Sequence, residues 1–246
     1  MKLALECPTQ ILYEIQPLAD YDFILTHLVF EDKTYRDYYK SSKRWKILDN
    51  SCNELLKPVP ISALAEAAEL VEPDLIVAPD YLGDSKRTLE SIKESIRVFG
   101  IEKVLPVVQG SSYKEALNCF EEIASLGCEC IAVPYDMGCE RTDHPDQMAL
   151  GRMQLVTSII SRVPISYYIH LLGMTTLEEL TSYASGWIKS VDTGVPIMMG
   201  LDGRRLGRDR LRDKSQPTLS RMVSKDNYYD LGGCFYNIAY LRKVLA

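Results

Sequence analysis

The sequence predicts an α/β fold in which eight parallel strands form a (β/α)8 barrel of the TIM type. Two patterns favour this fold. Short apolar runs alternate with amphipathic segments, which is the order of strands and helices in parallel sheets. The runs are apolar throughout, as is typical of strands that are covered on both faces. The length of 246 residues suits one such barrel and predicts a single domain over residues 1–246.

The predicted strands are eight apolar runs. They span residues 23–30, 46–49, 75–79, 104–108, 130–134, 165–172, 187–191 and 196–201. Only residues 192–195 separate the seventh and eighth runs, which is too short for a crossover helix. The barrel is therefore expected to be degenerate near its seventh and eighth strands, or one of the runs is not a strand.

Five segments carry apolar residues at three- and four-residue spacing, which predicts helices. They span residues 61–71, 85–99, 113–125, 145–161 and 177–183. Pro60 suits a helix start, and Gly100 and Gly127 suit helix ends. Each predicted helix follows a predicted strand, as parallel pairing requires.

The composition limits the class of protein. Apolar residues make up 46% of the chain and charged residues 25%, which is the balance of a folded globular protein. The net charge of −6 argues against a globally basic surface, so any contact with nucleic acid is expected to be local. The sequence shows no run near the roughly 20 apolar residues of a membrane span and no signal-peptide core. We therefore expect a cytoplasmic protein without membrane contact.

Polar residues follow the predicted strands, at the face of the barrel where active sites of this fold lie. In chain order they are His27, Asp49, Asn50, Asp80, Gln109, Gly110, Tyr135, Asp136, His170, Gly173, Asp192, Gly200 and Asp202. A single Asp or Gly at such a position most often caps a helix or makes a turn. Several carboxylates on one rim are better explained by a ligand site. Paired carboxylates can attack a sugar carbon and move protons, which predicts transfer at a sugar carbon.

Six short segments match the motifs of a known family in order. They are residues 48–51 (LDNS), 77–80 (VAPD), 106–110 (PVVQG), 130–136 (CIAVPYD), 170–174 (HLLGM) and 192–196 (DTGVP). Together they resemble the tRNA-guanine transglycosylases, TIM-barrel enzymes that exchange a guanine in nucleic acid for a 7-deazaguanine base. The last segment is similar to the Asp-x-x-x-Pro of that family's nucleophile. The resemblance covers residues 46–203.

The C-terminal part departs from the family. Its Cys-x-Cys-x-x-Cys…His zinc site is missing, because Cys234 is the only cysteine after Cys139. Cys128 and Cys130 are no substitute, since a structural zinc needs four converging ligands. We therefore predict no zinc subdomain, no metal and no cofactor, and we expect the seven cysteines to be free, mostly buried thiols.

The short chain is closer to the compact phage and bacterial enzymes that insert 7-deazaguanines into DNA. A DNA acceptor is therefore preferred to a tRNA. If the protein is encoded by a phage, the cytoplasm would be that of the host.

The resemblance implies a role for each matching residue. Asp192 would be the nucleophile at C1′ of a guanosine, and Asp49 would move the proton at N9 of the leaving and entering bases. The base would be bound by Asp80, Gln109, Gly110, Tyr135, Asp136, His170 and Gly173. In this arrangement Asp80 accepts hydrogen bonds from the N1 and N2 edge, while Gln109 and Gly110 donate to O6. For His170, a hydrogen-bonded structural histidine is an equal alternative.

Two segments combine basic and aromatic residues and are candidate contacts to the nucleic-acid backbone. They are residues 35–46, with Arg36, Lys40, Lys43 and Arg44, and residues 204–214, with Arg204, Arg205 and Arg208. A base must leave the stack to reach the pocket, so the protein has to hold the neighbouring backbone. A basic track beside the pocket is expected, and a solvated surface is the alternative for each segment.

Two other functions stay open at this point. One is a catalytically silent, nucleic-acid-binding scaffold subunit of a transglycosylase, although such a subunit would not need Asp49 and Asp192. The other is a carbohydrate-active barrel, which would normally place several Trp side chains at its mouth, whereas this chain has only Trp45 and Trp187. A homodimer is compatible with all three functions.

Overall fold

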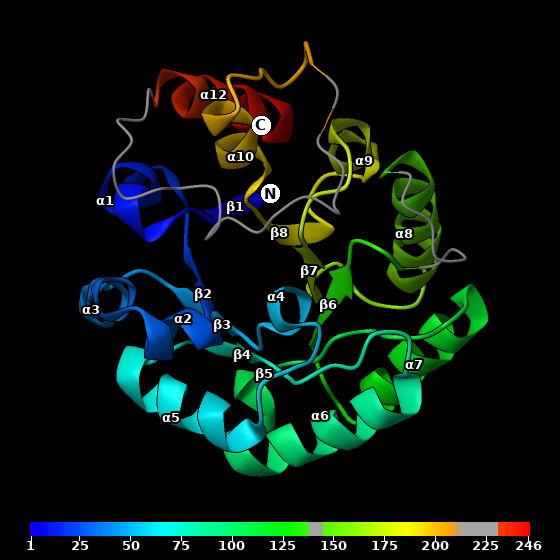
Figure 1. Cartoon of the computed structure of the whole chain (residues 1–246). Helices are drawn as coiled ribbons and strands as arrows, with labels where there is room; N and C mark the ends of the chain where they lie inside the picture. Colours follow the sequence, from blue (N-terminus) through cyan, green and yellow to red (C-terminus); the bar gives the residue numbers. More distant parts are fainter. Residues whose placement is uncertain (138–144, 210, 212–230) are drawn as a thin grey trace.

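The computed structural model describes residues 1–137, 145–209, 211 and 231–246, and in this part of the chain strands and helices alternate (Figure 1). The strands are β1 (Lys2–Leu5), β2 (Asp22–Leu25), β3 (Lys46–Asp49), β4 (Leu75–Val77), β5 (Val104–Leu105), β6 (Cys130–Pro134), β7 (Tyr168–Leu172) and β8 (Ile188–Thr193). The helices are α1 (Leu12–Ile15), α2 (Thr26–Glu31), α3 (Lys33–Ser41), α4 (Cys52–Leu55), α5 (Ile61–Val71), α6 (Ser85–Phe99), α7 (Tyr113–Ser125), α8 (Pro145–Ile160), α9 (Leu177–Ser182), α10 (Val195–Leu201) and α12 (Gly232–Leu245). Three short 3-10 helices, η1 (Thr9–Ile11), η2 (Gln16–Leu18) and η3 (Ile101–Lys103), complete the described elements.

The strands form two parallel sheets of four strands each, in the orders β1-β8-β7-β6 and β2-β3-β4-β5. Backbone hydrogen bonds also link the two sheets at their edges. Beside β1 and β2, the N–H of Asp20 donates to the carbonyl of Leu3 over 2.8 Å. Beside β5 and β6, Ala132 donates to Pro106 over 2.8 Å and accepts from Val108 over 3.0 Å. The α/β class predicted from the sequence is confirmed.

Three differences from the predicted strands concern the ends of the strand series. The run 196–201 was wrongly predicted as a strand and forms α10, in which Pro196 occupies the first turn, where its missing N–H costs nothing. The predicted strand over 23–30 ends as β2 at Leu25, and the chain turns into α2 at Thr26. The sequence prediction missed β1, whose apolar stretch is only Leu3–Leu5 and which depends on pairing with β8.

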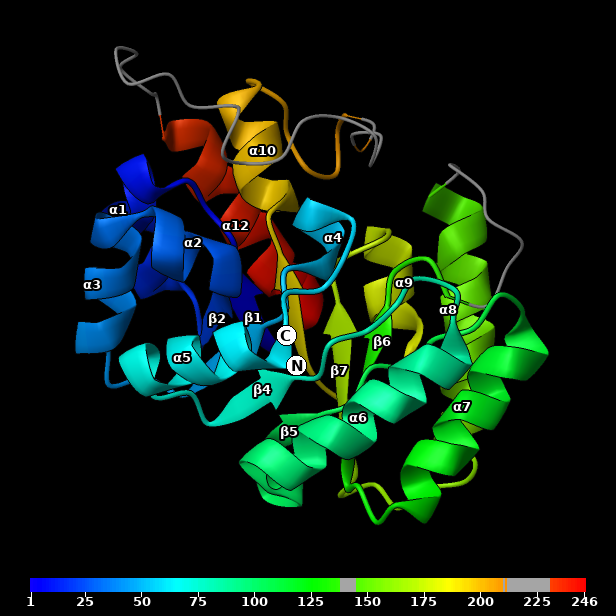
Figure 2. The ribbon, with the colours of Figure 1, turned by 60° about the horizontal axis from the view of Figure 1, so that its bottom comes forward.

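The predicted helices over 61–71, 85–99, 113–125, 145–161 and 177–183 are confirmed as α5 to α9. Side-chain caps define three of their starts. Asp84 accepts from the N–H of Arg87, Ser112 from Glu115 and Thr176 from Glu179. Helices α5, α6 and α7 lie outside the strands and cover them (Figure 2).

Helices α10 and α12 pack closely through two glycines. A Cβ at Gly200 would lie 2.4 Å from the backbone N of Cys234, and one at Gly233 would lie 2.6 Å from the carbonyl O of Gly200. Only glycine allows this approach. The contact holds α12 against α10, which follows the carboxyl end of β8 (Figure 1).

None of the helices in the described ranges is both long and apolar enough to cross a membrane. The cysteines within these ranges, Cys7, Cys52, Cys119, Cys128, Cys130 and Cys234, are free thiols and nearly all are buried, as expected. Cys139 lies outside the described residues.

Candidate active site

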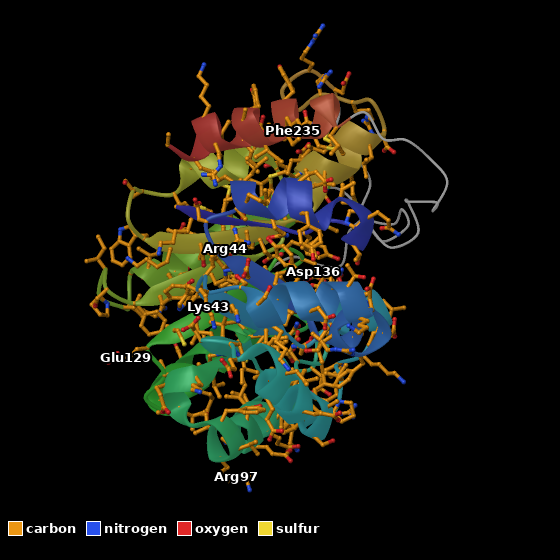
Figure 3. The ribbon with its side chains drawn as sticks, turned by 90° about the vertical axis from the view of Figure 1, so that its left-hand side faces the viewer. Lys43, Arg44, Arg97, Glu129, Asp136 and Phe235 are labelled. Atoms are coloured by element: carbon orange, nitrogen blue, oxygen red, sulfur yellow. The ribbon has the colours of Figure 1, made fainter. Side chains whose placement is uncertain are left out.

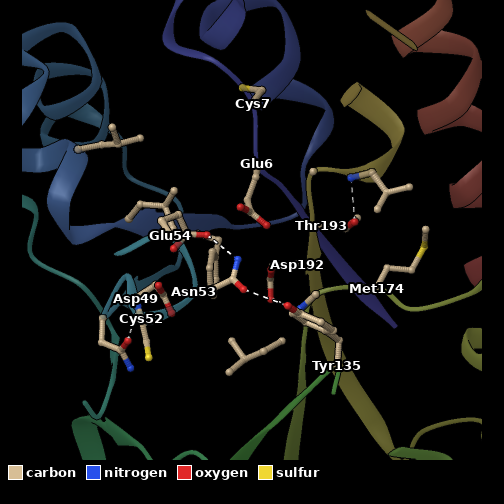
Figure 4. A pocket seen from close by; sticks show the side chains of 18 of the residues that line it. Glu6, Cys7, Asp49, Cys52, Asn53, Glu54, Tyr135, Met174, Asp192 and Thr193 are labelled. Atoms are coloured by element: carbon tan, nitrogen blue, oxygen red, sulfur yellow. Dashed lines mark hydrogen bonds between the residues drawn. The ribbon is translucent and has the colours of Figure 1, made fainter. Parts of the chain in front are cut away.

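A cavity of about 370 Å³ lies at the carboxyl ends of the strands and is lined from both sheets. The predicted site residues that line it are Asp49, Asp80, Gln109, Tyr135, Asp136, Gly173 and Asp192, together with His27 and Asn50. Its volume is in the range of small-molecule sites. In Figure 4, the carboxyl groups of Asp49 and Asp192 face the same hollow from different strands.

The cavity is strongly acidic. Its lining contains the carboxyl groups of Glu6, Asp32, Asp49, Glu54, Asp80, Asp136 and Asp192, whereas no Lys or Arg is found among the described lining residues. Each negative charge in such a group raises the pKa of its neighbours, which disfavours ionisation of all of them together. The protonation of each one therefore depends on its own hydrogen bonds.

Asp192 is the carboxyl that the surrounding donors hold in the ionised form. Its Oδ1 accepts from Nε2 of His170 over 3.0 Å and from the N–H of Gly173 over 3.1 Å. Burial by itself raises the pKa of Asp192. The hydrogen bond and charge of His170, the hydrogen bond with Glu6 and the Gly173 N–H outweigh burial, so that this pKa lies below its usual value.

The pKa of Asp49 is shifted in the opposite direction. Its Oδ2 accepts from the N–H of Ser51 over 2.6 Å. Burial, followed by the charge of Glu54, raises the pKa of Asp49 well above its usual range, although the Ser51 hydrogen bond opposes the shift. The charges of Asp192 and Asp80 add to the increase. The surroundings therefore favour the charged form of Asp192 and the neutral form of Asp49.

Asp80 lies on a small network of buried amides. Its Oδ1 accepts from Nδ2 of Asn50 over 2.8 Å, and its Oδ2 accepts from Nε2 of Gln109. Burial raises the pKa of Asp80 to about 6, while these two hydrogen bonds lower it and the charge of Asp136 adds to the increase. Asp80 is therefore a hydrogen-bond acceptor that is mostly ionised at neutral pH.

The structure uses Gln109 and Gly110 differently from their predicted contact with O6 of a base. Gln109 is fully buried, and its Oε1 accepts from the N–H of Gly83 over 3.0 Å while its amide N donates to Asp80. Gly110 does not line the cavity. A Cβ at this position would lie 2.5 Å from the backbone N of Ala116, so Gly110 allows close packing at the start of α7.

His170 lies behind Asp192 and is not part of the cavity lining. It is completely buried, stacks on Phe23 with ring centroids 5.7 Å apart, and contacts Oγ of Ser190 through Nδ1 over 2.8 Å. Of its two alternatives, the structure thus supports a hydrogen-bonded histidine that orients a neighbour.

Tyr135 and Asp136 form one wall of the cavity at the end of β6, and α4 forms the wall that faces them. The Tyr135 hydroxyl donates to Oδ1 of Asn53 over 3.1 Å, as drawn in Figure 4. This contact connects α4 to β6 across the cavity. It fixes the distance between the walls and therefore the width of any ligand that fits.

The turn at Gly173 is held by Arg152, which also forms a buried ion pair with Glu179. Nη1 of Arg152 donates to the carbonyls of Leu172 and Gly173 over 3.1 and 2.9 Å. Its Nε and Nη2 donate to both carboxyl oxygens of Glu179, each over 2.6 Å. Gly173 itself has φ 69°, which favours glycine. Arg152 thereby orients the amide that binds Asp192.

The basic side chains of residues 35–46 do not line the cavity, whereas Tyr35 and Tyr39 of the same segment do. Arg44 donates to the carbonyl of Ala19 over 3.1 Å and forms an ion pair with the buried Asp22, so its guanidinium belongs to the interior. Lys40 and Lys43 precede β3, toward the amino ends of the strands, whereas the cavity is at the carboxyl ends. In Figure 3, Lys43 and Arg44 lie apart from Asp136, on the side of Glu129, which is the residue before β6.

The other predicted contacts of residues 35–46 are also mostly internal. Arg36 donates to the carbonyl of Val29 over 3.1 Å. Tyr35 and Tyr39 are buried in the core and also line the cavity, and Trp45 packs against the core. Two aromatic rings of this segment thus reach the cavity, and its contact with nucleic acid stays a prediction.

The second basic segment follows α10 and reaches the cavity, since Leu211 is one of the lining residues. Arg205 donates to the carbonyl of Gly232 over 3.1 Å and lies 4.9 Å over the ring of Tyr236. Arg204 is half-buried, whereas Arg208 is exposed. Residues 210 and 212–214 of this segment lie outside the described residues. The predicted strand-end residues Gly200 and Asp202 belong to α10 and its end, because that run is a helix.

Glu6 is a site residue that the sequence prediction missed. It directly follows β1 and lines the cavity next to Asp192 (Figure 4). Burial and the charge of Asp192 raise the pKa of Glu6 well above its usual range. The sequence feature that could have indicated Glu6 is the apolar stretch Leu3–Leu5, which is directly followed by this acid. Asp49 likewise follows apolar residues at the end of its predicted strand.

Within the described ranges, no group of three or more His, Cys, Asp or Glu residues is arranged to hold a metal ion. No family model matches the chain, and a comparison with curated proteins finds no relative. The function therefore has to be argued from the geometry and protonation of this cavity.

Proposed function

We propose that the protein is a base-exchange glycosyltransferase that replaces a guanine in nucleic acid by a 7-deazaguanine base. The observation that supports this proposal is that Asp192 and Asp49 line one cavity in different surroundings: Asp192 accepts from His170 and the Gly173 N–H, which favours its charged form, whereas Asp49 faces other carboxyls, which favours its neutral form. A retaining transfer at a sugar carbon needs an ionised carboxylate to attack and a protonated carboxyl to assist the leaving group. The two environments supply these two states.

In the first step, an oxygen of the Asp192 carboxylate attacks C1′ and forms a glycosyl ester. The C1′–N9 bond breaks, its electron pair goes to N9 of guanine, and Asp49 gives its proton to the base. In the second step, the now ionised Asp49 takes the N9 proton of the incoming base. N9 then attacks C1′, and the ester electrons return to Asp192.

Base selection would depend on Asp80 at the carboxyl end of β4. Each of its oxygens accepts one hydrogen bond from an amide of the protein and has a second lone pair that can accept from the base. The N1–H and N2–H₂ edge of guanine or a 7-deazaguanine offers the matching donors. A base without these donors would leave Asp80 less satisfied, which selects against it.

The acidic lining suits a base with several N–H groups, whereas a phosphate would be repelled by it. The sugar-phosphate backbone would thus stay at the mouth, on the side where the second basic segment reaches the cavity with Leu211. We prefer DNA to tRNA as the acceptor because the residues that follow the matching segments carry no zinc motif. The reaction would take place in the cytoplasm and is compatible with a homodimer.

We further propose that the two sheets close into one eight-stranded barrel. The contacts of Asp20 with Leu3 and of Ala132 with Pro106 and Val108 support closure at both edges, where β1 meets β2 and β5 meets β6. Closure would explain why polar residues after strands of both sheets reach one cavity. A crystal structure with a continuous strand order β1 to β8 would agree, whereas an open edge at either junction would not.

The function is tested by incubating the protein with labelled guanine and with duplex DNA, single-stranded DNA or tRNA. We expect label to enter one of these polymers, and we expect Asp192→Asn and Asp49→Asn to lower the rate at least about 10³-fold. Asp37→Asn removes an exposed carboxylate outside the cavity and should change nothing. Exchange that survives Asp192→Asn contradicts the mechanism. Binding of nucleic acid without exchange by the wild type would instead indicate a silent subunit.

A further inference from the structure

The backbone places Glu6 beside the proposed nucleophile. In the register of β1 with β8, Ala4 lies opposite Asp192 and Leu5 opposite Thr193. The N–H of Glu6 then donates to the carbonyl of Thr193 over 3.1 Å, which continues the pairing beyond β1. Glu6 is thus fixed by strand pairing, and its carboxyl faces the cavity next to that of Asp192 (Figure 4).

The two carboxyl groups line the same cavity from paired strands, so their charges interact. Two adjacent carboxylates repel, which favours one proton held between them in a hydrogen bond. The position of this proton follows from the other neighbours. Asp192 also accepts from His170 and from the N–H of Gly173, which favours its charged form. The titratable groups that face Glu6 are Asp192, Glu54 and Asp49, and all of them are carboxyl groups. The proton therefore stays on Glu6.

We propose that the Glu6 carboxylic acid is a positioning residue that stabilises the free carboxylate of Asp192 relative to its glycosyl ester. This inference rests on the proposed function. A hydrogen bond from the O–H of Glu6 is stronger to a carboxylate than to the neutral carbonyl oxygen of an ester. The contact therefore favours return of the ester electrons to Asp192 and keeps the covalent intermediate short-lived.

Glu6 keeps its proton throughout both steps. When Asp192 forms the C1′–O bond, the Glu6 hydrogen bond weakens as the negative charge leaves. When the incoming N9 displaces Asp192, the charge returns and the hydrogen bond strengthens again. The proton that the bases exchange is carried by Asp49, so Glu6 changes the balance between free enzyme and ester without adding a proton transfer.

The test compares Glu6→Ala, Glu6→Met and Glu6→Gln with the wild type. Met keeps most of the volume without a donor, and Gln keeps an N–H donor. A guanine-containing oligonucleotide is added without free base, the reaction is quenched in denaturant, and the covalent protein–oligonucleotide fraction is measured. We expect the ratio of adduct to free enzyme to rise about tenfold in the Ala and Met variants and to stay near the wild-type ratio in the Gln variant. Glu14→Ala, which removes an exposed glutamate of α1, is the matched control.

The outcomes separate this inference from the function on which it rests. If the wild type exchanges guanine and the Ala and Met variants form no more adduct than the wild type, the role of Glu6 is wrong and the function stands. If the wild type forms no adduct and exchanges no base, both fail. Independently of activity, ¹³C NMR of labelled glutamate should show a protonated Glu6 carboxyl at pH 7. An ionised Glu6 at that pH would overturn the inference.

Discussion

His170 donates from Nε2 to Oδ1 of Asp192 over 3.0 Å, although the histidine itself is fully buried and does not reach the cavity. With Asp192 ionised, Nε2 of His170 carries the proton that it donates. Nδ1 of the same ring contacts Oγ of Ser190 over 2.8 Å, and this Oγ also contacts the Tyr168 hydroxyl over 2.6 Å. A chain of hydrogen bonds thus runs from Tyr168 through Ser190 and His170 to Asp192.

This geometry predicts the effect of His170→Phe, which keeps an aromatic ring against Phe23 but removes the donor. The pKa of Asp192 is lowered by His170, so the substitution should raise it. Because the reaction needs ionised Asp192, the acid limb of kcat for guanine exchange at saturating base should move to higher pH. The rate at neutral pH should fall about 10- to 100-fold. The measurement is the exchange rate between pH 5 and 8.

Ser190→Ala is the matched control for His170→Phe, since it removes the outer partner of the histidine and leaves the donor to Asp192. It should shift the acid limb much less. An unchanged acid limb in His170→Phe would show that Asp192 is held ionised without this histidine.

Asp80 predicts a pH dependence of base binding. Burial raises the pKa of Asp80 to about 6, and only the ionised carboxylate offers acceptors to both donors of the base edge. Above this pH the affinity should be constant. As the pH falls below it, the ionised fraction and the affinity should both fall about tenfold per pH unit. Titration calorimetry with 7-deazaguanine at several pH values between 5 and 8 measures this change.

Asp80→Asn provides the comparison for this pH dependence. Its affinity should be lower than that of the wild type at pH 7, and it should lose the dependence that arises from this group. A wild-type affinity that is flat across the range would mean that Asp80 does not contact the base.

The convergence of Asp49, Asp80 and Asp192 could be predicted from the sequence because each one ends or follows an apolar run. In parallel strands, such ends meet at one face. The run 196–201 could not be assigned correctly in this way. Helix α10 is buried on nearly all sides, so it lacks the polar face that would give a helical period.

Other features depend on contacts that are distant in sequence. β1 has only four residues and becomes a strand through its pairing with β8, so Glu6 was missed together with it. Arg44 belongs to a basic run, but its partner Asp22 is on another strand. Local sequence shows that a cation is present and does not show whether an interior carboxylate already pairs with it.

The Arg152–Glu179 pair predicts a large loss of stability on Arg152→Met. Both side chains are fully buried, so the substitution leaves the Glu179 charge without its partner. Breaking a buried pair in this way costs about 3–5 kcal/mol. The double variant Arg152→Met/Glu179→Met should recover most of this loss, because no unpaired charge remains. Urea unfolding monitored by circular dichroism measures both.

Lys33→Met is the control for the Arg152 variants. It breaks the exposed pair of Lys33 with Asp37 on α3 and should leave the unfolding midpoint unchanged. If Arg152→Met were as stable as the wild type, the ion pair would not be what holds the turn at Gly173.

The position of the nucleic-acid backbone is tested by reversing two exposed cations at opposite ends of the strands. Arg208 precedes Leu211, which lines the cavity, whereas Lys43 precedes the amino end of β3. Arg208→Glu should weaken DNA binding and lower the slope of log affinity against log salt by about one, because one phosphate contact is lost. Lys43→Glu changes the net charge of the protein by the same amount and should leave that slope unchanged. Fluorescence anisotropy with a labelled oligonucleotide gives both slopes. The two variants have equal net charge, so a general repulsion of DNA would weaken the binding of both alike. A difference between their slopes would therefore indicate that the DNA backbone crosses the mouth of the cavity.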